Sequence, residues 1–116
     1  GVSVISLIAP TSEDRIKMIA SEAEGFIYIV SSMGVTGVRS EIKTDIGHIM
    51  EAVKKYAKVP AAVGFGISKP EQAKKMADLS DGVIVGSAIV KLVAQYGSDA
   101  PDHIYEYVKS MKDAIR

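Results

Sequence analysis

The sequence predicts an α/β fold in which four parallel strands alternate with helices. The candidate strands are four short runs rich in Val and Ile, near residues 2–8, 26–31, 60–65 and 82–86. These runs do not alternate strictly between apolar and polar residues, which is typical of parallel strands buried on both faces. The segments between them carry apolar residues at helical spacing. Alternating strands and helices favour a parallel sheet with right-handed connections.

The first two helices are indicated by apolar stripes between the first three strands. The stripe of the first helix consists of Ile16, Ile19, Ala20 and Ala23. The stripe of the second helix consists of Ile42, Ile46, Ile49, Val53 and Tyr56. Thr11, with Asp14 three residues later, forms a weak capping pair and predicts where the first helix starts.

Polar residues and a proline mark the starts of the later helices. Ser68 and Glu71, with Pro70 between them, predict the N-cap and first turn of the third helix. Ser87 is expected to cap a short helix that runs to about Tyr96. The break YGSDAPD precedes a last helix whose apolar face consists of Ile104, Val108, Met111 and Ile115. The predicted order is therefore βαβαβαβ followed by two helices, in a single domain that spans residues 1–116.

The composition argues against several kinds of partner and site. Lys plus Arg and Asp plus Glu both number 14, so there is no net charge to attract nucleic acid. The absence of cysteine excludes disulfides, thiolate nucleophiles and cysteine metal sites. The two histidines have no neighbouring third ligand, so no metal site is expected. The apolar runs are too short to span a bilayer and no secretory leader is recognised, which leads us to expect a cytoplasmic protein.

Glycine-rich segments follow three of the predicted strands. They are SSMGVTGVRS after the second, GFGIS after the third and GSAIVK after the fourth. The carboxyl ends of parallel strands meet at one edge, where helix N-termini present free N–H groups and glycine lets the backbone approach an anion. Each junction alone is also explained by a tight turn, a helix cap or an ordinary loop. Three such junctions, on neighbouring strands, favour a phosphate site.

Four βα units can form a small doubly wound sheet or an arc of a barrel, and longer motifs favour the barrel. The segments FIYIVSSMGVTGVRS, PAAVGFGISKPEQ and DGVIVGSAIVKL closely resemble the C-terminal half of the tryptophan synthase α chain, strands five to eight. The resemblance implies a parallel (βα)4 half of a TIM (βα)8 barrel. It also implies descent from a lyase of tryptophan biosynthesis, which cleaves indole-3-glycerol phosphate into indole and glyceraldehyde 3-phosphate.

The resemblance implies roles for residues in and beside the glycine-rich segments. The substrate phosphate would be held by Gly37, Gly66, Gly86 and Ser87. Tyr28 would face the reacting part of the substrate, Phe65 would line the indole pocket and Thr36 would pack near the catalytic loop. No cofactor is implied for this chain, because the pyridoxal phosphate of the family belongs to the β chain.

Catalytic residues are not expected within these 116 residues. In the family the general acid and base are a Glu and an Asp from the second barrel strand and the loop after it, and that region has no counterpart here. We therefore expect the isolated chain to be catalytically inactive. Three positions depart from the family pattern: Ser32 replaces an Arg before Gly-Val-Thr-Gly, and Val4 and Ser6 replace a Pro and a strand Phe. Natural truncation and engineering both remain open explanations.

A half barrel exposes two strand edges and an apolar face, so the sequence predicts a homodimer formed through the open barrel face, or a higher homo-oligomer. One alternative is a monomer whose sheet flattens and carries helices on both faces. Functionally, the alternatives are a module that binds a phosphate-ester small molecule without turnover and a self-associating structural module without a ligand. Contact with a tryptophan synthase β chain is implied by the resemblance alone.

Overall fold

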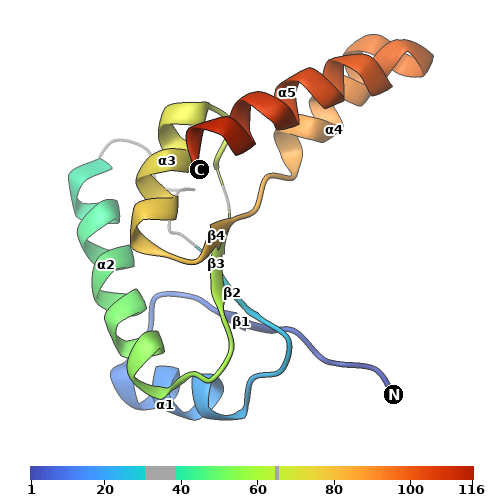
Figure 1. Cartoon of the computed structure of the whole chain (residues 1–116). Helices are drawn as coiled ribbons and strands as arrows, with labels where there is room; N and C mark the ends of the chain where they lie inside the picture. Colours follow the sequence, from blue (N-terminus) through green and yellow to red (C-terminus); the bar gives the residue numbers. More distant parts are fainter. Residues whose placement is uncertain (31–38, 65) are drawn as a thin grey trace.

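The computed structural model describes residues 1–30, 39–64 and 66–116 (Figure 1). The strands are β1 Ser6–Ile8, β2 Ile27–Val30, β3 Ala61–Gly64 and β4 Gly82–Val83. They form one parallel sheet in the order β1-β2-β3-β4. The helices are α1 Glu13–Glu22, α2 Arg39–Tyr56, α3 Pro70–Leu79, α4 Ser87–Tyr96 and α5 Ala100–Ala114, with a 3-10 turn, η1 Gly97–Asp99, between the last two. The predicted order of strands and helices is confirmed.

The outer strands are shorter than the apolar runs that predicted them. Ser6 of β1 faces Ile27, the first residue of β2, so residues 2–5 extend beyond the start of the neighbouring strand. At the other edge, β4 pairs with β3 only as far as Val83, and the Ile84 amide then donates a hydrogen bond to the Val63 carbonyl. A ladder continues only where a facing strand continues, which limits β1 at its start.

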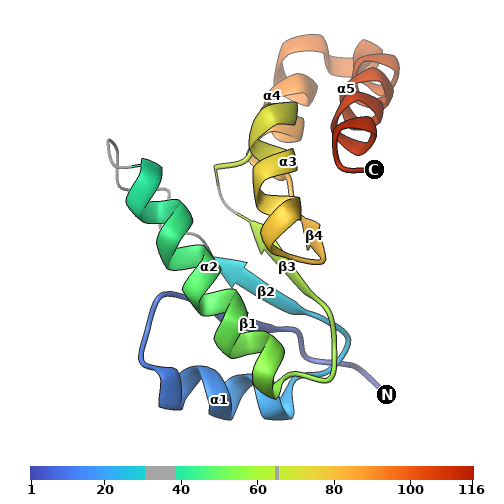
Figure 2. The ribbon, with the colours of Figure 1, turned by 60° about the vertical axis from the view of Figure 1, so that its left-hand side comes forward.

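Helices α1, α2 and α3 lie on one face of the sheet (Figures 1 and 2). The strand residues buried beneath them are Ile8, Ile27, Ile29, Ala61 and Val63. The helices contribute Ile16, Ala20, Ile46, Ile49, Val53, Ala73 and Met76 to the same core, and α5 adds Met111. Members of the stripes predicted for the first two helices, Ile16 and Ala20 in one and Ile46, Ile49 and Val53 in the other, are buried, because a 3.6-residue period brings those positions to one side.

The opposite face of the sheet is open, contrary to the expectation that the strands are buried on both faces. Side chains alternate between faces along a strand, so Leu7, Tyr28 and Ala62, which are paired in register, share this second face. Leu7 is 59% exposed there. The alternative of a flattened, doubly wound sheet with helices on both faces is wrong for this chain. The radius of gyration of 15.1 Å exceeds the roughly 13 Å of a compact domain of this length, in agreement with an uncovered face.

The helix caps differ from the predicted ones by one residue each. The N-cap of α1 is Ser12, whose Oγ accepts a hydrogen bond from the Arg15 amide at 3.4 Å, and not Thr11. At α3 the N-cap is Lys69, and the side chain that reaches back is Gln72, whose Oε1 accepts from the Lys69 amide at 3.1 Å. Where several polar residues precede a helix, the spacing pattern alone does not identify which one is the cap.

The last two helices leave apolar residues exposed. Helix α4 has no buried residue, and Val90 and Val93 on it are 66% and 48% exposed. Helix α5 buries Met111 and packs Ile115 against the core, whereas Val108 of its predicted apolar face is 44% exposed. Within the part of the chain that the structure describes, no helix is both long and apolar enough to cross a membrane.

Candidate functional site

The carboxyl ends of β2, β3 and β4 meet at one edge of the sheet, because the strands are parallel and adjacent. A pocket of about 140 Å³ lies at this edge. Its lining consists of Tyr28, Gly66, Ile67, Ile84, Gly86 and Ser87. Four residues that the sequence singled out as site residues are thus brought together from three separate segments.

Three predicted site residues lie outside the described part of the chain. Gly37 and Thr36 belong to the segment 31–38, and Phe65 stands between the described residues 64 and 66. Ser32, which departs from the family pattern, lies in the same segment as Gly37. Their predicted roles therefore remain predictions.

Tyr28 enters the site from the open face of the sheet and lies over Gly64. A methyl group built at Gly64 would lie 2.5 Å from Cζ and 2.6 Å from Cε1 of the Tyr28 ring. Tyr28 pairs with Ala62 in the ladder, so Gly64 is its diagonal neighbour on β3, within reach of an aromatic ring. Glycine at position 64 is therefore required for the ring to occupy this place. Sequence reasoning missed this role, because Gly64 and Tyr28 are far apart in the chain.

Gly66 follows β3 with a backbone φ of 73°, in the left-handed region that favours glycine. The next residue, Ile67, is only 4% exposed and belongs to the core cluster. The backbone of Gly66 thus lines the pocket, and the chain re-enters the core at the next residue, Ile67. This arrangement holds a backbone segment at the pocket without a side chain at Gly66.

Gly86 and Ser87 form the start of α4, with Gly86 as the N-cap and Ser87 as the first helical residue. The expectation that Ser87 itself is the cap is wrong by one residue. The amides of Ile89 and Val90 both donate to the Gly86 carbonyl, at 3.0 and 3.1 Å. The amides before them belong to the first turn, which has no acceptor inside a helix and carries the positive end of the helix dipole.

Gly86 differs from Gly64, because a side chain at position 86 would not clash with a described neighbour. Among the described residues, a methyl group built at Gly86 would meet no atom within 4 Å, and its φ of −121° is open to any residue. Packing within the described chain therefore gives no reason for glycine here. Close approach of a ligand to the backbone would be such a reason.

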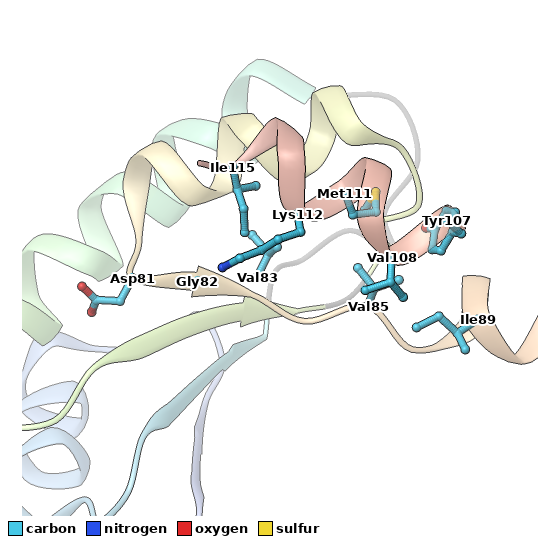
Figure 3. A pocket seen from close by; sticks show the side chains of 10 residues that line it. All are labelled: Asp81, Gly82, Val83, Val85, Ile89, Tyr107, Val108, Met111, Lys112 and Ile115. Atoms are coloured by element: carbon cyan, nitrogen blue, oxygen red, sulfur yellow. The ribbon is translucent and has the colours of Figure 1, made fainter. Parts of the chain in front are cut away.

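A larger cavity, of about 400 Å³, lies between the segment that contains β4 and helix α5 (Figure 3). Its lining consists of Asp81, Gly82, Val83, Val85, Ile89, Tyr107, Val108, Met111, Lys112 and Ile115. Along the chain, Ile84 and Gly86 line the small pocket, whereas Val85 and Ile89 line the large cavity. The large cavity is mainly aliphatic. The small pocket, where a helix start and glycine backbone converge, is the better candidate for an anion.

Acid–base chemistry has few candidates at the small pocket. Among its described lining residues, Tyr28 alone has a titratable side chain, and none carries a carboxylate. Over the described residues of the chain as a whole, no three His, Asp or Glu side chains gather in a way that could hold a metal ion. What the pocket offers is backbone N–H groups, one hydroxyl and one phenol.

Comparison with known proteins identifies relatives over the full length of the chain. A family model described as tryptophan synthase alpha chain matches residues 1–116. The chain is 50% identical over 115 residues to the tryptophan synthase alpha chain of Lacticaseibacillus casei, covering 99% of this chain and 43% of the relative. It is 54% identical over 95 residues to that of Geobacillus thermodenitrificans, covering 82% of this chain and 35% of the relative.

Solved structures give the same result for the fold. The alpha subunit of Campylobacter jejuni tryptophan synthase superposes with a TM-score of 0.77 at 32% identity, covering 97% of this chain and 42% of that one. A chain from the tryptophan synthase α2β2 complex of Pyrococcus furiosus superposes with a TM-score of 0.79 at 34% identity, covering 97% and 46%. The chain thus spans less than half the length of the relatives that it matches. Its strands superpose on part of the TIM barrel of these relatives.

Proposed function

The chain belongs to the tryptophan synthase alpha chain family, and from this premise we propose that its residues bind the phosphate group of a phosphate-ester substrate. The observation that carries the proposal is the pocket of about 140 Å³ lined by Gly66, Gly86 and Ser87. Free amides at a helix start and a glycine-lined backbone stabilise a phosphate anion. The proposed ligand is indole-3-glycerol phosphate, with Tyr28 beside its reacting part.

Three further contacts belong to the same proposal. Gly37 would give a backbone contact to the phosphate from the segment after β2. Phe65 would line the indole side of the pocket, and Thr36 would pack nearby. These three assignments rest on the family resemblance of the segments GVTG and GFGIS.

We propose that the 116 residues bind this ligand without cleaving it. The carbon–carbon cleavage needs a general acid and a general base at the reacting atoms. The described lining of the pocket offers no carboxylate for either task. Incubation with indole-3-glycerol phosphate should therefore release no indole above the buffer rate, as measured by absorbance after chromatography. Indole release at an enzymatic rate would contradict this part of the proposal.

Phosphate binding is tested by an amide NMR titration with glycerol 3-phosphate at low salt, with glycerol as the control ligand. We expect saturable shifts at Gly66, Gly86 and Ser87 with the phosphate ester and none with glycerol. Ser87→Glu should abolish the shifts at other amides, because it puts a negative charge at the helix start. Ser98→Glu adds the same charge beyond the other end of α4 and should leave binding unchanged. An unresponsive spectrum in the wild type would overturn the proposal.

A second proposed property is self-association through the open face of the sheet. The observation that favours it is the exposure of apolar residues there: Leu7 is 59% exposed on β1, and Val2 and Val4 before it are 90% and 74% exposed. Among the described strands, β1 and β4 are the outermost ones of the sheet. A second copy related by a two-fold axis would add four strands, cover both faces and provide the eight strands that close a barrel.

Self-association is tested by light scattering after size exclusion over a range of concentrations. We expect a dimeric mass for the wild type and a monomeric mass for Leu7→Asp. Met18 on α1 has the same exposed fraction of 59%, so Met18→Asp is the matched control and should leave the dimer intact. A monomeric wild type at all concentrations would exclude the dimer. An additional species of higher order would point to pairing of free strand edges.

A further inference from the structure

Tyr107 of α5 forms a hydrogen bond with the backbone beside the small pocket. Its phenol donates to the Ser68 carbonyl oxygen at 2.6 Å, between residues that are 39 positions apart. The Tyr107 ring packs against the hydrophobic core and lines the large cavity, where it projects from α5 close to Met111 and Val108 (Figure 3). The last helix of the chain thus holds the segment that follows β3.

Ser68 is held from its other side by α3. Its amide donates to Gln72 Oε1 at 3.0 Å, and its hydroxyl lies 3.2 Å from the same oxygen. The Lys69 amide shares that acceptor at 3.1 Å. The peptide groups before and after Ser68 are therefore fixed by two side chains from two different helices. Tyr107 fixes the carbonyl and Gln72 fixes the amides.

The segment fixed in this way leads directly out of the small pocket. Gly66 and Ile67 line the pocket and precede Ser68. Gly66 has a φ of 73° and no side chain to anchor it, so neighbouring anchors determine how its peptide groups are oriented. Ile67 supplies one anchor by burial in the core. The bond from Tyr107 supplies the next one along the chain.

We propose that Tyr107 is a positioning residue for the anion pocket: its hydrogen bond to Ser68 holds the Gly66–Ile67 backbone in the orientation that a phosphate ester requires. The inference rests on the proposed phosphate binding, and it extends the site to a helix that contributes no residue to the pocket lining. Preorganised donors bind an anion more tightly than mobile ones, because less conformational entropy is lost on binding. The phenol does not touch the ligand.

The experiment compares Tyr107→Phe with Tyr105→Phe in the intact chain. Both changes remove one phenolic hydroxyl from α5, but Tyr105 is 63% exposed and lines neither pocket. The probe is glycerol 3-phosphate, titrated by amide NMR, and the thermal midpoint is measured in parallel. We expect Tyr107→Phe to weaken binding about threefold or more, the range of one lost hydrogen bond. Tyr105→Phe should bind as the wild type does.

A second readout needs no ligand. Amide hydrogen exchange at Ile67, Ser68 and Lys69 should accelerate in Tyr107→Phe relative to amides in α2, and should be unchanged in Tyr105→Phe. Equal affinity and equal local exchange in Tyr107→Phe and the wild type would overturn the inference. If the wild type binds no glycerol 3-phosphate, the proposed function fails. Faster local exchange would then still show that Tyr107 anchors the segment, and unchanged exchange would remove that role as well.

Discussion

The ring of Tyr28 occupies the space above the backbone of Gly64, so that these two residues fit together across β2 and β3. The fit links the core sheet to the pocket, because Tyr28 is also one of the pocket residues. A side chain at position 64 and the tyrosine ring at position 28 exclude each other. This relationship leads to the first prediction.

Gly64→Ala should destabilise the fold by about 1–3 kcal/mol, the usual cost of overpacking a filled site. The added methyl group would meet the Tyr28 ring. When Tyr28 is already replaced by Ala, the further change Gly64→Ala should cost much less stability than it does in the wild type, because the clashing ring is gone. Urea unfolding of the two single variants and the double variant gives the coupling energy. Additive effects would contradict the steric relationship.

Gly47→Ala should have the opposite effect. Gly47 lies inside α2, and a methyl group built there would meet no atom within 4 Å in the described part of the chain. Alanine has the higher helix propensity, so the free energy of unfolding should rise by about 0.5–1 kcal/mol. The same urea experiment measures it. A loss of stability would show that the residue has a neighbour to which the glycine is adapted.

Asp81 should be the most important carboxylate for the sheet. Its Oδ2 accepts a hydrogen bond from the Ala61 amide at 2.9 Å, and its own amide donates to the Ala61 carbonyl at 2.9 Å. Asp81→Ala leaves the partly buried Ala61 amide without this acceptor and should cost about 1–3 kcal/mol. Asp78→Ala is the control, because Asp78 forms only an exposed ion pair with Lys74 and should change stability by less than about 0.5 kcal/mol. Similar losses in both variants would refute the role of Asp81.

The contribution of Tyr107 to the free energy of unfolding should decrease at alkaline pH. Burial raises the pKa of the Tyr107 phenol above its ordinary value of 10.0. A group whose pKa is raised on folding contributes stability that is complete below the unfolded pKa and lost as the pH rises through the folded pKa. The difference in unfolding free energy between the wild type and Tyr107→Phe should therefore be constant up to about pH 9 and shrink above about pH 10.

The measurement for this prediction is urea unfolding of both proteins from about pH 8 to about pH 11. Tyr105→Phe, which removes an exposed phenol from the same helix, provides the control. A difference that grows with pH would contradict the prediction.

Periodicity and composition were enough to predict the order of the elements, because each signal is local. Apolar stripes such as Ile46, Ile49 and Val53 turned out to face the core. Helix caps were predicted one residue away from their true positions, since neighbouring polar residues compete for one geometric role. The contacts of Tyr28 with Gly64 and of Tyr107 with Ser68 join residues that are distant in the chain, and no local pattern marks them.

The candidate site was predicted in part for a related reason. Gly66, Gly86 and Ser87 follow the carboxyl ends of β3 and β4, and parallel strands bring these ends to one edge wherever they occur in the sequence. Ile67 and Ile84, which complete the lining, read as ordinary core residues. Their part in the pocket depends on the path of the chain after each strand. That path depends on anchors such as Gln72 that become visible only in three dimensions.

The segment after β4 contributes residues to both pockets. Ile84 and Gly86 line the small pocket, and Val85 and Ile89 line the large cavity. The register of this segment relies on a short ladder, in which Gly82 and Val83 pair with β3 and the Ile84 amide bonds to the Val63 carbonyl. A slip by one residue would turn every side chain of an extended segment to the other side. Valine would then enter the small pocket where glycine now opens it. The chemistry available to a ligand there is thus decided by a few backbone hydrogen bonds at the edge of the sheet.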